Sequence, residues 1–107
     1  MREKLARIIE KIEQAQAGVL STSMRRGLEK ESLRIDAEGV LSWQPHPTAL
    51  GAALTHRFIT TDYSEALLEF VTPATVGVED LLTFLTQLHQ FTYRNIGAEK
   101  LWVNSMP

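Results

Sequence analysis

The chain opens with a helical pattern of apolar positions. Within residues 2–17, apolar side chains recur at intervals of three and four, with charged side chains between them. This spacing would place them on one stripe of an α-helix, and Gly18 is a natural stop for it. The residues of the stripe are Leu5, Ile8, Ile9, Ile12 and Ala15. We therefore expect an N-terminal helix that packs through this stripe.

Between about Arg26 and Ile35 the pattern changes to a period of two, which is typical of a β-strand. Successive side chains of a strand point to opposite faces, so Glu29 and Glu31 would lie on the same face as Leu33. Such a face is normally turned toward a core, where unpaired carboxylates are costly. The two glutamates therefore need an explanation.

A turn and a long loop follow this strand. Residues 36–39, Asp-Ala-Glu-Gly, predict a hairpin turn in which Gly39 adopts a positive φ. The return strand would then begin within residues 40–43. Residues 44–62 contain two prolines, a glycine and several threonines, and they predict a long ordered loop. Loops of this length inside a compact domain are often functional.

Two further elements complete the expected domain. Residues 66–72, ALLEFVT, are apolar on both faces, as in a buried strand, and Pro73 ends the run. From Glu79 to Ile96 the helical spacing returns, and Gly97 can close the helix. The predicted fold is α+β, with a mainly antiparallel sheet flanked by an N-terminal and a C-terminal helix.

Composition narrows the class of protein. The chain has 107 residues, enough for one domain, and a net charge of −2, whereas a nucleic-acid module would usually be basic. Without cysteine, neither disulfides nor thiolate metal sites are available. No apolar run approaches the ~20 residues that cross a bilayer, and the charged N-terminus does not resemble a signal peptide. We therefore expect a soluble, cytoplasmic protein without nucleic-acid or membrane partners.

Glu69 is the carboxylate that most needs a partner. It interrupts the apolar run LLEFV, residues 67–71, where an unpaired ionised carboxylate would be strongly destabilising. One explanation is an internal salt bridge to an arginine, for which the candidates are Arg26, Arg34 and Arg57. A second explanation is a protonated glutamic acid in the core, and a third is a functional role.

The other carboxylates have simple structural interpretations when each is taken alone. Glu29 and Glu31 fit the exposed acidic face of an edge strand. Asp62, in the stretch TTDYSE, is a common cap or turn residue, and Glu65 three positions later would complete a capping box. None of these residues indicates a function by itself.

Taken together, the carboxylates predict a metal site. If the hairpin strand neighbours the strand at 67–71, Glu29, Glu31 and Glu69 converge. Asp62 would then stand at the mouth of that strand. Up to four negative charges in one place repel one another and favour a bound cation. Oxygen ligands without cysteine favour Mg²⁺ or Mn²⁺ over zinc, and carboxylate-bound Mg²⁺ commonly holds nucleotide phosphates.

The remaining candidate residues point to structure rather than chemistry. His46, His56 and His89 do not have the spacing of metal ligands. Trp43 and Trp102 are expected in the core or at an interface rather than as platforms for stacking bases. The sequence contains neither a phosphate-binding P-loop nor a G-x-S-x-G nucleophile motif.

Four stretches of the sequence occur together in a characteristic order: RRGLEKESLRI, HPTALGAALTHRFITTDYSEALLEFVTP, LTFLTQLHQFTYRNIG and LWVNSMP. In this order and spacing they closely resemble the N-terminal region of bacterial glutamate–cysteine ligase. The similarity covers roughly residues 24–107.

The resemblance implies an ATP-dependent ligase with a glutamine-synthetase-like fold, in which ATP is a co-substrate. In that family the γ-carboxylate of glutamate attacks the γ-phosphate of ATP. The cysteine amine then displaces phosphate from the acyl phosphate, giving γ-glutamylcysteine in the first step of glutathione biosynthesis. By the same resemblance, Tyr63 lies near the acceptor cysteine, no catalytic side chain is assigned within this chain, and the ligands of Mg²⁺ or Mn²⁺ are Glu29, Glu31, Asp62 and Glu69.

Members of that family are several times longer than this chain, which leaves two interpretations. Residues 1–107 are either the N-terminal part of a ligase catalytic domain, carrying one wall of the active site, or a non-catalytic piece. Such a piece would bind metal or dock on a larger chain. In the full enzyme the sheet would pair with later strands, so an open sheet edge and apolar face predict that the isolated chain associates with itself or is only marginally stable.

Overall fold

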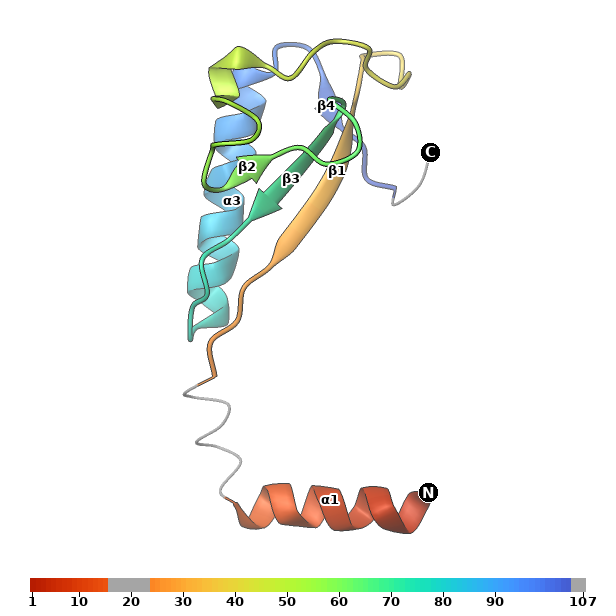
Figure 1. The fold of residues 1–107 in the computed structure, drawn as a ribbon, viewed down its shortest axis with the longest axis vertical. Helices are drawn as coiled ribbons and strands as arrows, with labels where there is room; N and C mark the ends of the chain where they lie inside the picture. The colour runs from red at the N-terminus through yellow and green to blue at the C-terminus, as the bar shows by residue number, and fades with distance from the viewer. Residues whose placement is uncertain (16–23, 105–107) are drawn as a thin grey trace.

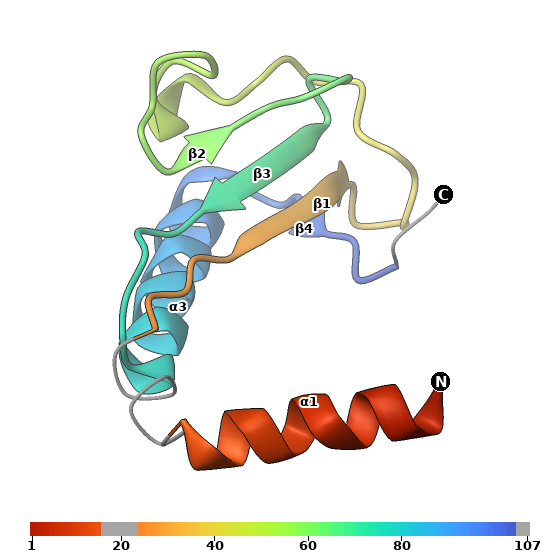
Figure 2. The same ribbon diagram turned by 60° about the horizontal axis from the view of Figure 1, so that its bottom comes forward.

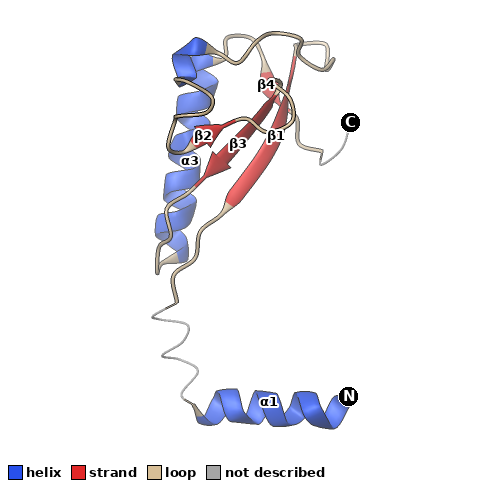
Figure 3. Ribbon diagram, in the orientation of Figure 1, coloured by secondary structure: helices blue, strands red, loops and turns tan. Residues whose placement is uncertain are grey.

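The computed structural model describes residues 1–15 and 24–104. Their elements, in chain order, are α1 (Arg2–Gln14), β1 (Glu29–Ile35), the short 3₁₀ turn η1 (Thr48–Leu50), β2 (Ile59–Thr60), β3 (Leu67–Val71), α3 (Val78–Asn95) and β4 (Lys100–Leu101). Figures 1 and 3 show a small sheet with a long helix against it. The prediction of an α+β fold with an antiparallel sheet is confirmed.

The sheet has the strand order β2-β3-β1-β4, and every neighbouring pair is antiparallel. β3 therefore has a partner on each side, as its continuous apolar run predicts. The register of β1 and β3 places Glu31 directly opposite Glu69 and Glu29 opposite Val71.

The main core lies between one face of the sheet and α3, which runs along that face in Figures 1 and 2. Alternate residues of the central strands point into it, because side chains of a strand alternate between faces. The buried members of this core are Leu50, Ile59, Leu68, Phe70, Leu88, Ile96 and Leu101. Because α3 covers this face of the sheet, only the opposite face is left without a covering helix in the described part of the chain.

A smaller apolar cluster covers one end of the opposite face. Leu33, Ala66 and Leu67 are buried there, and Leu41 and Trp102 pack against them. The expectation for Trp102 is therefore confirmed. Trp43 is 89% exposed, so within this chain it is not a core residue.

The expected hairpin is shorter than its sequence suggests. Asp36 and Gly39 form the turn, with Gly39 at φ 84°, but Leu41 makes only a single antiparallel bridge to Ile35 within the described residues. The backbone of Arg34 accepts a bond from Ser42 and donates one to Ala66. The return segment thus stops at Arg34, because from there on β3 occupies the same side of β1.

Several predicted boundaries also move. β1 begins at Glu29 rather than near Arg26, which makes an isolated bridge to Thr75. The predicted loop at 44–62 is not entirely irregular, since it contains η1 and β2. The C-terminal helix agrees with its prediction to within one residue at each end, and Gly97 follows it at φ 65°.

The N-terminal helix forms, but its predicted packing is wrong in this structure. None of the 13 residues of α1, all of them described, is buried. The apolar stripe is open to solvent, with Leu5 57% and Ile9 48% exposed. The proposed stop at Gly18 lies outside the described residues. Neither described helix is long and apolar enough to cross a lipid bilayer.

Candidate functional site

The sheet brings three of the predicted carboxylates onto one face. Glu31 lies opposite Glu69, and Glu29 is two residues from Glu31 in the same strand, so all three share the face that is turned away from α3. On the other side of β3, Thr60 of β2 also lies opposite Glu69. The convergence expected from the sequence is therefore present in the register of the strands.

These side chains differ in their exposure. Glu29, Glu31 and Asp62 are exposed, whereas Glu69 is partly buried in the middle of the sheet. Tyr63, next to Asp62, is 72% exposed. The glutamates of β1 are thus surface residues in this chain, as their simplest interpretation predicts, on an uncovered part of the sheet rather than in a core. The strand that carries them is not an edge strand, however, because β1 lies between β3 and β4.

The carboxylates influence one another electrostatically. Burial raises the pKa of Glu69, and the charges of Glu29, Glu31 and Asp62 raise that pKa further. The charge of Asp62 thus acts on Glu69, although Asp62 lies in the connection before β3. A nearby cation would reverse this effect, because it favours the ionised form of every member.

The group fits an oxygen-ligated cation in its chemistry, but the side chains are not gathered into a cage. Among the described residues, no three His, Asp or Glu side chains are close enough together to hold a metal ion. Mg²⁺ usually retains several waters and binds through one or two carboxylates together with substrate phosphates, so a facing pair such as Glu31 and Glu69 matches its ligand chemistry without forming a complete site. Glu29 and Asp62 would then add negative charge around that pair.

Two of the three arginines proposed as salt-bridge partners of Glu69, Arg34 and Arg57, have other partners in the structure. Arg34 pairs with Glu99 instead, at 2.5 Å between Nη1 and Oε2. The guanidinium of Arg57 lies over the ring of Phe58, 5.2 Å from its centroid. Arg26 donates from Nη1 to the carbonyl of Val76.

Of the two simple interpretations of Asp62, the helix cap is wrong, because the described segment after it forms a turn and then β3 rather than a helix, whereas the turn interpretation fits. Thr61 Oγ1 donates to the carbonyl of Ser64 at 2.5 Å, and the amide of Ala66 donates to Ser64 Oγ at 3.1 Å. This turn carries Asp62 and Tyr63 at the edge of the acidic face.

The three histidines are not among the charges that act on Glu69, and His56 and His89 have structural contacts. His56 Nδ1 accepts bonds from the amides of Phe58 and Ile59. His89 contacts the Phe70 ring edge-on and bonds through Nδ1 to the carbonyl of Leu85. The pKa of His46 is lowered, chiefly by burial and then by the charge of Arg34.

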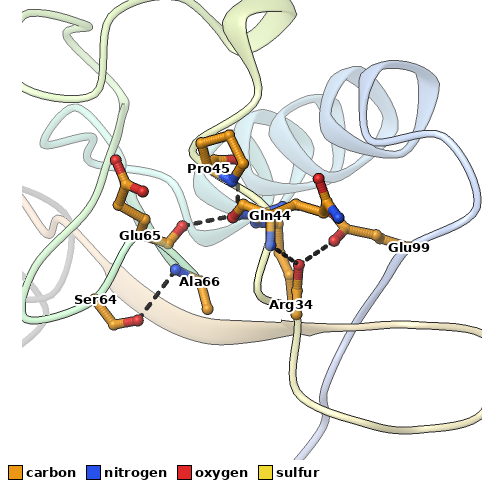
Figure 4. A network of polar contacts seen from close by, with 8 residues as sticks. Arg34, Gln44, Pro45, Ser64, Glu65, Ala66 and Glu99 are labelled. Atoms are coloured by element: carbon orange, nitrogen blue, oxygen red, sulfur yellow. Dashed lines mark hydrogen bonds and ion pairs between the residues drawn. The ribbon is translucent and has the colours of Figure 1, made fainter.

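A buried polar network beside the site was missed by the sequence analysis. Arg34 is fully buried on β1 and is held by Glu99, which follows α3 (Figure 4). The available signal was the charge of Arg34 in a strand whose neighbours are apolar. Its partner is 65 residues away, so spacing could not identify it.

Comparison with known proteins gives the family. A family model described as "Glutamate-cysteine ligase" matches residues 9–107. The glutamate–cysteine ligase of Alcanivorax borkumensis is 58% identical over 93 residues, which are 87% of this chain and 18% of that protein. The chain thus spans less than a fifth of the length of this relative.

Solved structures agree. The glutamate–cysteine ligase of Francisella tularensis, in complex with AMP, matches with a TM-score of 0.75 and 39% identity, over 78% of this chain and 17% of that one. A bifunctional glutathione synthetase from Pasteurella multocida matches with a TM-score of 0.81 and 37% identity, over 90% of this chain and 13% of that one. The family-model match over residues 9–107 and the similarity to these ligases show that the chain belongs to the glutamate–cysteine ligase family.

Proposed function

We propose that this chain forms the metal-binding wall of the active site in a ligase that joins L-glutamate to L-cysteine. One observation carries the proposal: Glu31 faces Glu69 on an uncovered sheet face in a chain of this family. Burial first, and then the neighbouring carboxylates, raise the pKa of Glu69. Repulsion of this kind destabilises the chain unless a cation compensates it.

In the proposed reaction, ATP activates the γ-carboxylate of glutamate. A carboxylate oxygen attacks the γ-phosphorus, the bond to ADP breaks, and an acyl phosphate forms. The cysteine amine then attacks the acyl carbon, phosphate leaves, and the amine loses a proton as the amide forms. A bound Mg²⁺ or Mn²⁺ would neutralise phosphate charge during this transfer.

The residues of this chain would act by position and charge. Glu31 and Glu69 would hold the cation, while Glu29 and Asp62 would increase its attraction to the site. Tyr63 would line the place of the acceptor cysteine, a role that its exposure next to Asp62 allows. The AMP bound to the relative from Francisella tularensis supports a nucleotide substrate. A cytoplasmic location remains a prediction.

The second candidate is a non-catalytic role, in which the chain docks on a larger protein. The open apolar stripe of α1 favours it, because exposed apolar patches often mark interaction surfaces. Metal binding by the isolated chain is compatible with both candidates, whereas ligase activity distinguishes them.

Direct measurement of Mn²⁺ binding by electron paramagnetic resonance tests the metal site. We expect the 107-residue chain to bind Mn²⁺, Glu69→Gln to bind it more weakly, and added Mg²⁺ to compete. Glu38→Gln is the matched control, since Glu38 is exposed in the turn at 36–39 and its loss removes the same charge. Equal Mn²⁺ binding by parent, Glu69→Gln and Glu38→Gln would contradict the proposed site.

A further inference from the structure

Arg34 joins four segments of the chain through its guanidinium group. It is completely buried in β1, and Nη1 donates to Oε2 of Glu99 at 2.5 Å. Nη2 donates to three backbone carbonyls, those of Gln44 at 2.7 Å, Pro45 at 3.1 Å and Glu65 at 2.9 Å. Figure 4 shows these groups converging on the arginine from different elements.

Glu99 is itself held in place. Its Oε1 accepts a hydrogen bond from the hydroxyl of Ser42, and its side chain is only 16% exposed. A buried ion pair of this kind is weak evidence for stability, because apolar residues often replace it without loss. The Arg34–Glu99 pair is therefore better explained by the conformation that it holds than by a contribution to stability.

The bonds of Arg34 reach the elements that carry the acidic group. Its own amide donates to the carbonyl of Ala66 at 2.7 Å, and Nη2 holds the carbonyl of Glu65. Residues 65 and 66 connect the turn that carries Asp62 to β3, which carries Glu69. Three residues before Arg34, the same strand carries Glu31.

We propose that Arg34 and Glu99 are positioning residues for the acidic group. They fix the 62–66 turn against β1, so that Asp62 and Glu69 are held next to Glu31. The register puts Arg34 on the face opposite to Glu31 and Glu69, and Glu99 pairs with Arg34. This inference rests on the proposed function only where it concerns the bound cation.

A double substitution separates positioning from stability. Arg34→Met/Glu99→Leu removes both charges together, so it strands neither of them. The carbonyls of Gln44, Pro45 and Glu65 lose their donor, so the melting temperature should fall, but by less than a stranded charge would lower it. We expect its Mn²⁺ affinity to fall about 10-fold or more, the effect typical of losing groups that orient metal ligands. The control is Arg94→Met/Glu38→Leu, which makes the same chemical changes at two exposed positions and should bind Mn²⁺ as the parent does.

Hydrogen exchange gives a readout that needs no metal. In Arg34→Met/Glu99→Leu, the amides of Ala66 and Leu67 should exchange at least about 10-fold faster, while amides in the middle of α3, such as that of Leu88, keep their parent rates. A general loss of stability would accelerate both sets alike. Unchanged exchange at Ala66 and Leu67 overturns the positioning proposal.

The two experiments fail in different ways. If the parent does not bind Mn²⁺, the proposed function is wrong, and hydrogen exchange alone then decides whether Arg34 fixes the turn. If the parent binds and the folded double variant binds equally well, the positioning proposal is wrong and the proposed function stands. If the circular dichroism spectrum of the double variant differs from that of the parent, the variant is not folded correctly. Mn²⁺ binding and hydrogen exchange of Arg34→Lys then test the positioning proposal instead. Arg34→Lys keeps the charge but lacks the planar guanidinium that reaches several acceptors at once.

Discussion

Replacing Glu69 with glutamine removes one charge from the acidic group while keeping the shape of the side chain. Glu31 and Glu69 form a non-hydrogen-bonded pair, because the bonded positions of β1 and β3 are those of Arg34 with Ala66 and Leu28 with Thr72. In such pairs the side chains approach most closely, and like charges directly opposite are destabilising by about 0.2–1 kcal/mol. Glu29 and Asp62 add to this repulsion. We expect Glu69→Gln without metal to be more stable by about 1 kcal/mol.

The expected change is large enough to measure by thermal unfolding. About 1 kcal/mol corresponds to roughly 4–8 °C in melting temperature for a domain of this size. The parent should gain stability when Mg²⁺ is added, because a ligand that binds the folded state stabilises it, and Glu69→Gln should gain less. Melting curves of both proteins, with and without Mg²⁺, therefore give four values to compare.

The same reasoning fixes a dependence on pH. The pKa of Glu69 is raised in the folded state, so the folded protein binds the proton more tightly than the unfolded chain does. The parent therefore keeps its full stability below the unfolded pKa of about 4.3 and loses some as pH rises through the folded value. Glu69→Gln cannot lose stability in this way. The variant should therefore be more stable than the parent only at pH values above the folded-state pKa of Glu69.

One result would refute this reasoning. If Glu69 is half of a buried ion pair, the substitution leaves an arginine without its partner and costs about 3–5 kcal/mol. A loss of that size, equal with and without Mg²⁺, would exclude Glu69 as a metal ligand. Glu38→Gln, which should melt like the parent, controls for the loss of one charge.

Three further predictions concern the rest of the chain. The isolated chain should show no cysteine-dependent ATP hydrolysis, because it spans only 18% of a ligase relative; formation of γ-glutamylcysteine by the purified chain would contradict this. The open stripe of α1 should cause self-association, which Ile8→Lys/Ile12→Lys should reduce in sedimentation experiments, and identical sedimentation of both proteins would argue against it. The single change Arg34→Met should cost about 3–5 kcal/mol in denaturant unfolding, since it leaves Glu99 charged and partly buried; a cost below about 1 kcal/mol would show that the pair is not structurally important.

Local patterns were sufficient to predict most of the elements. The continuous apolar run of β3 and the helical spacing of α3 are properties of neighbouring residues, and both elements lie where those patterns put them. The alternation in β1 also correctly placed Glu29 and Glu31 on the same face as Leu33, although at the glutamates this face is exposed rather than turned toward a core. The metal assignment of these residues remains a prediction.

The features that local patterns missed depend on residues far away in the chain. The return strand after Gly39 stops early because β3 takes its place beside β1, and nothing within residues 36–43 encodes that competition. The stripe of α1 indicates an amphipathic helix, but it does not contain the surface that would cover it. Arg34 and Glu99 are likewise invisible as a pair until the fold brings them together.

The long separation between Arg34 and Glu99 has a consequence for how the chain folds. Their contact closes a loop of 65 residues, which contains β2, β3 and α3, so it forms only after the sheet and the helix have met. Contacts between distant residues are entropically costly to form early and tend to slow folding. We therefore expect Glu99 to have a φ-value near zero, with its substitution changing the unfolding rate rather than the folding rate. On this view the turn that carries Asp62 is fixed in one of the last steps of folding, after most of the core is already in place.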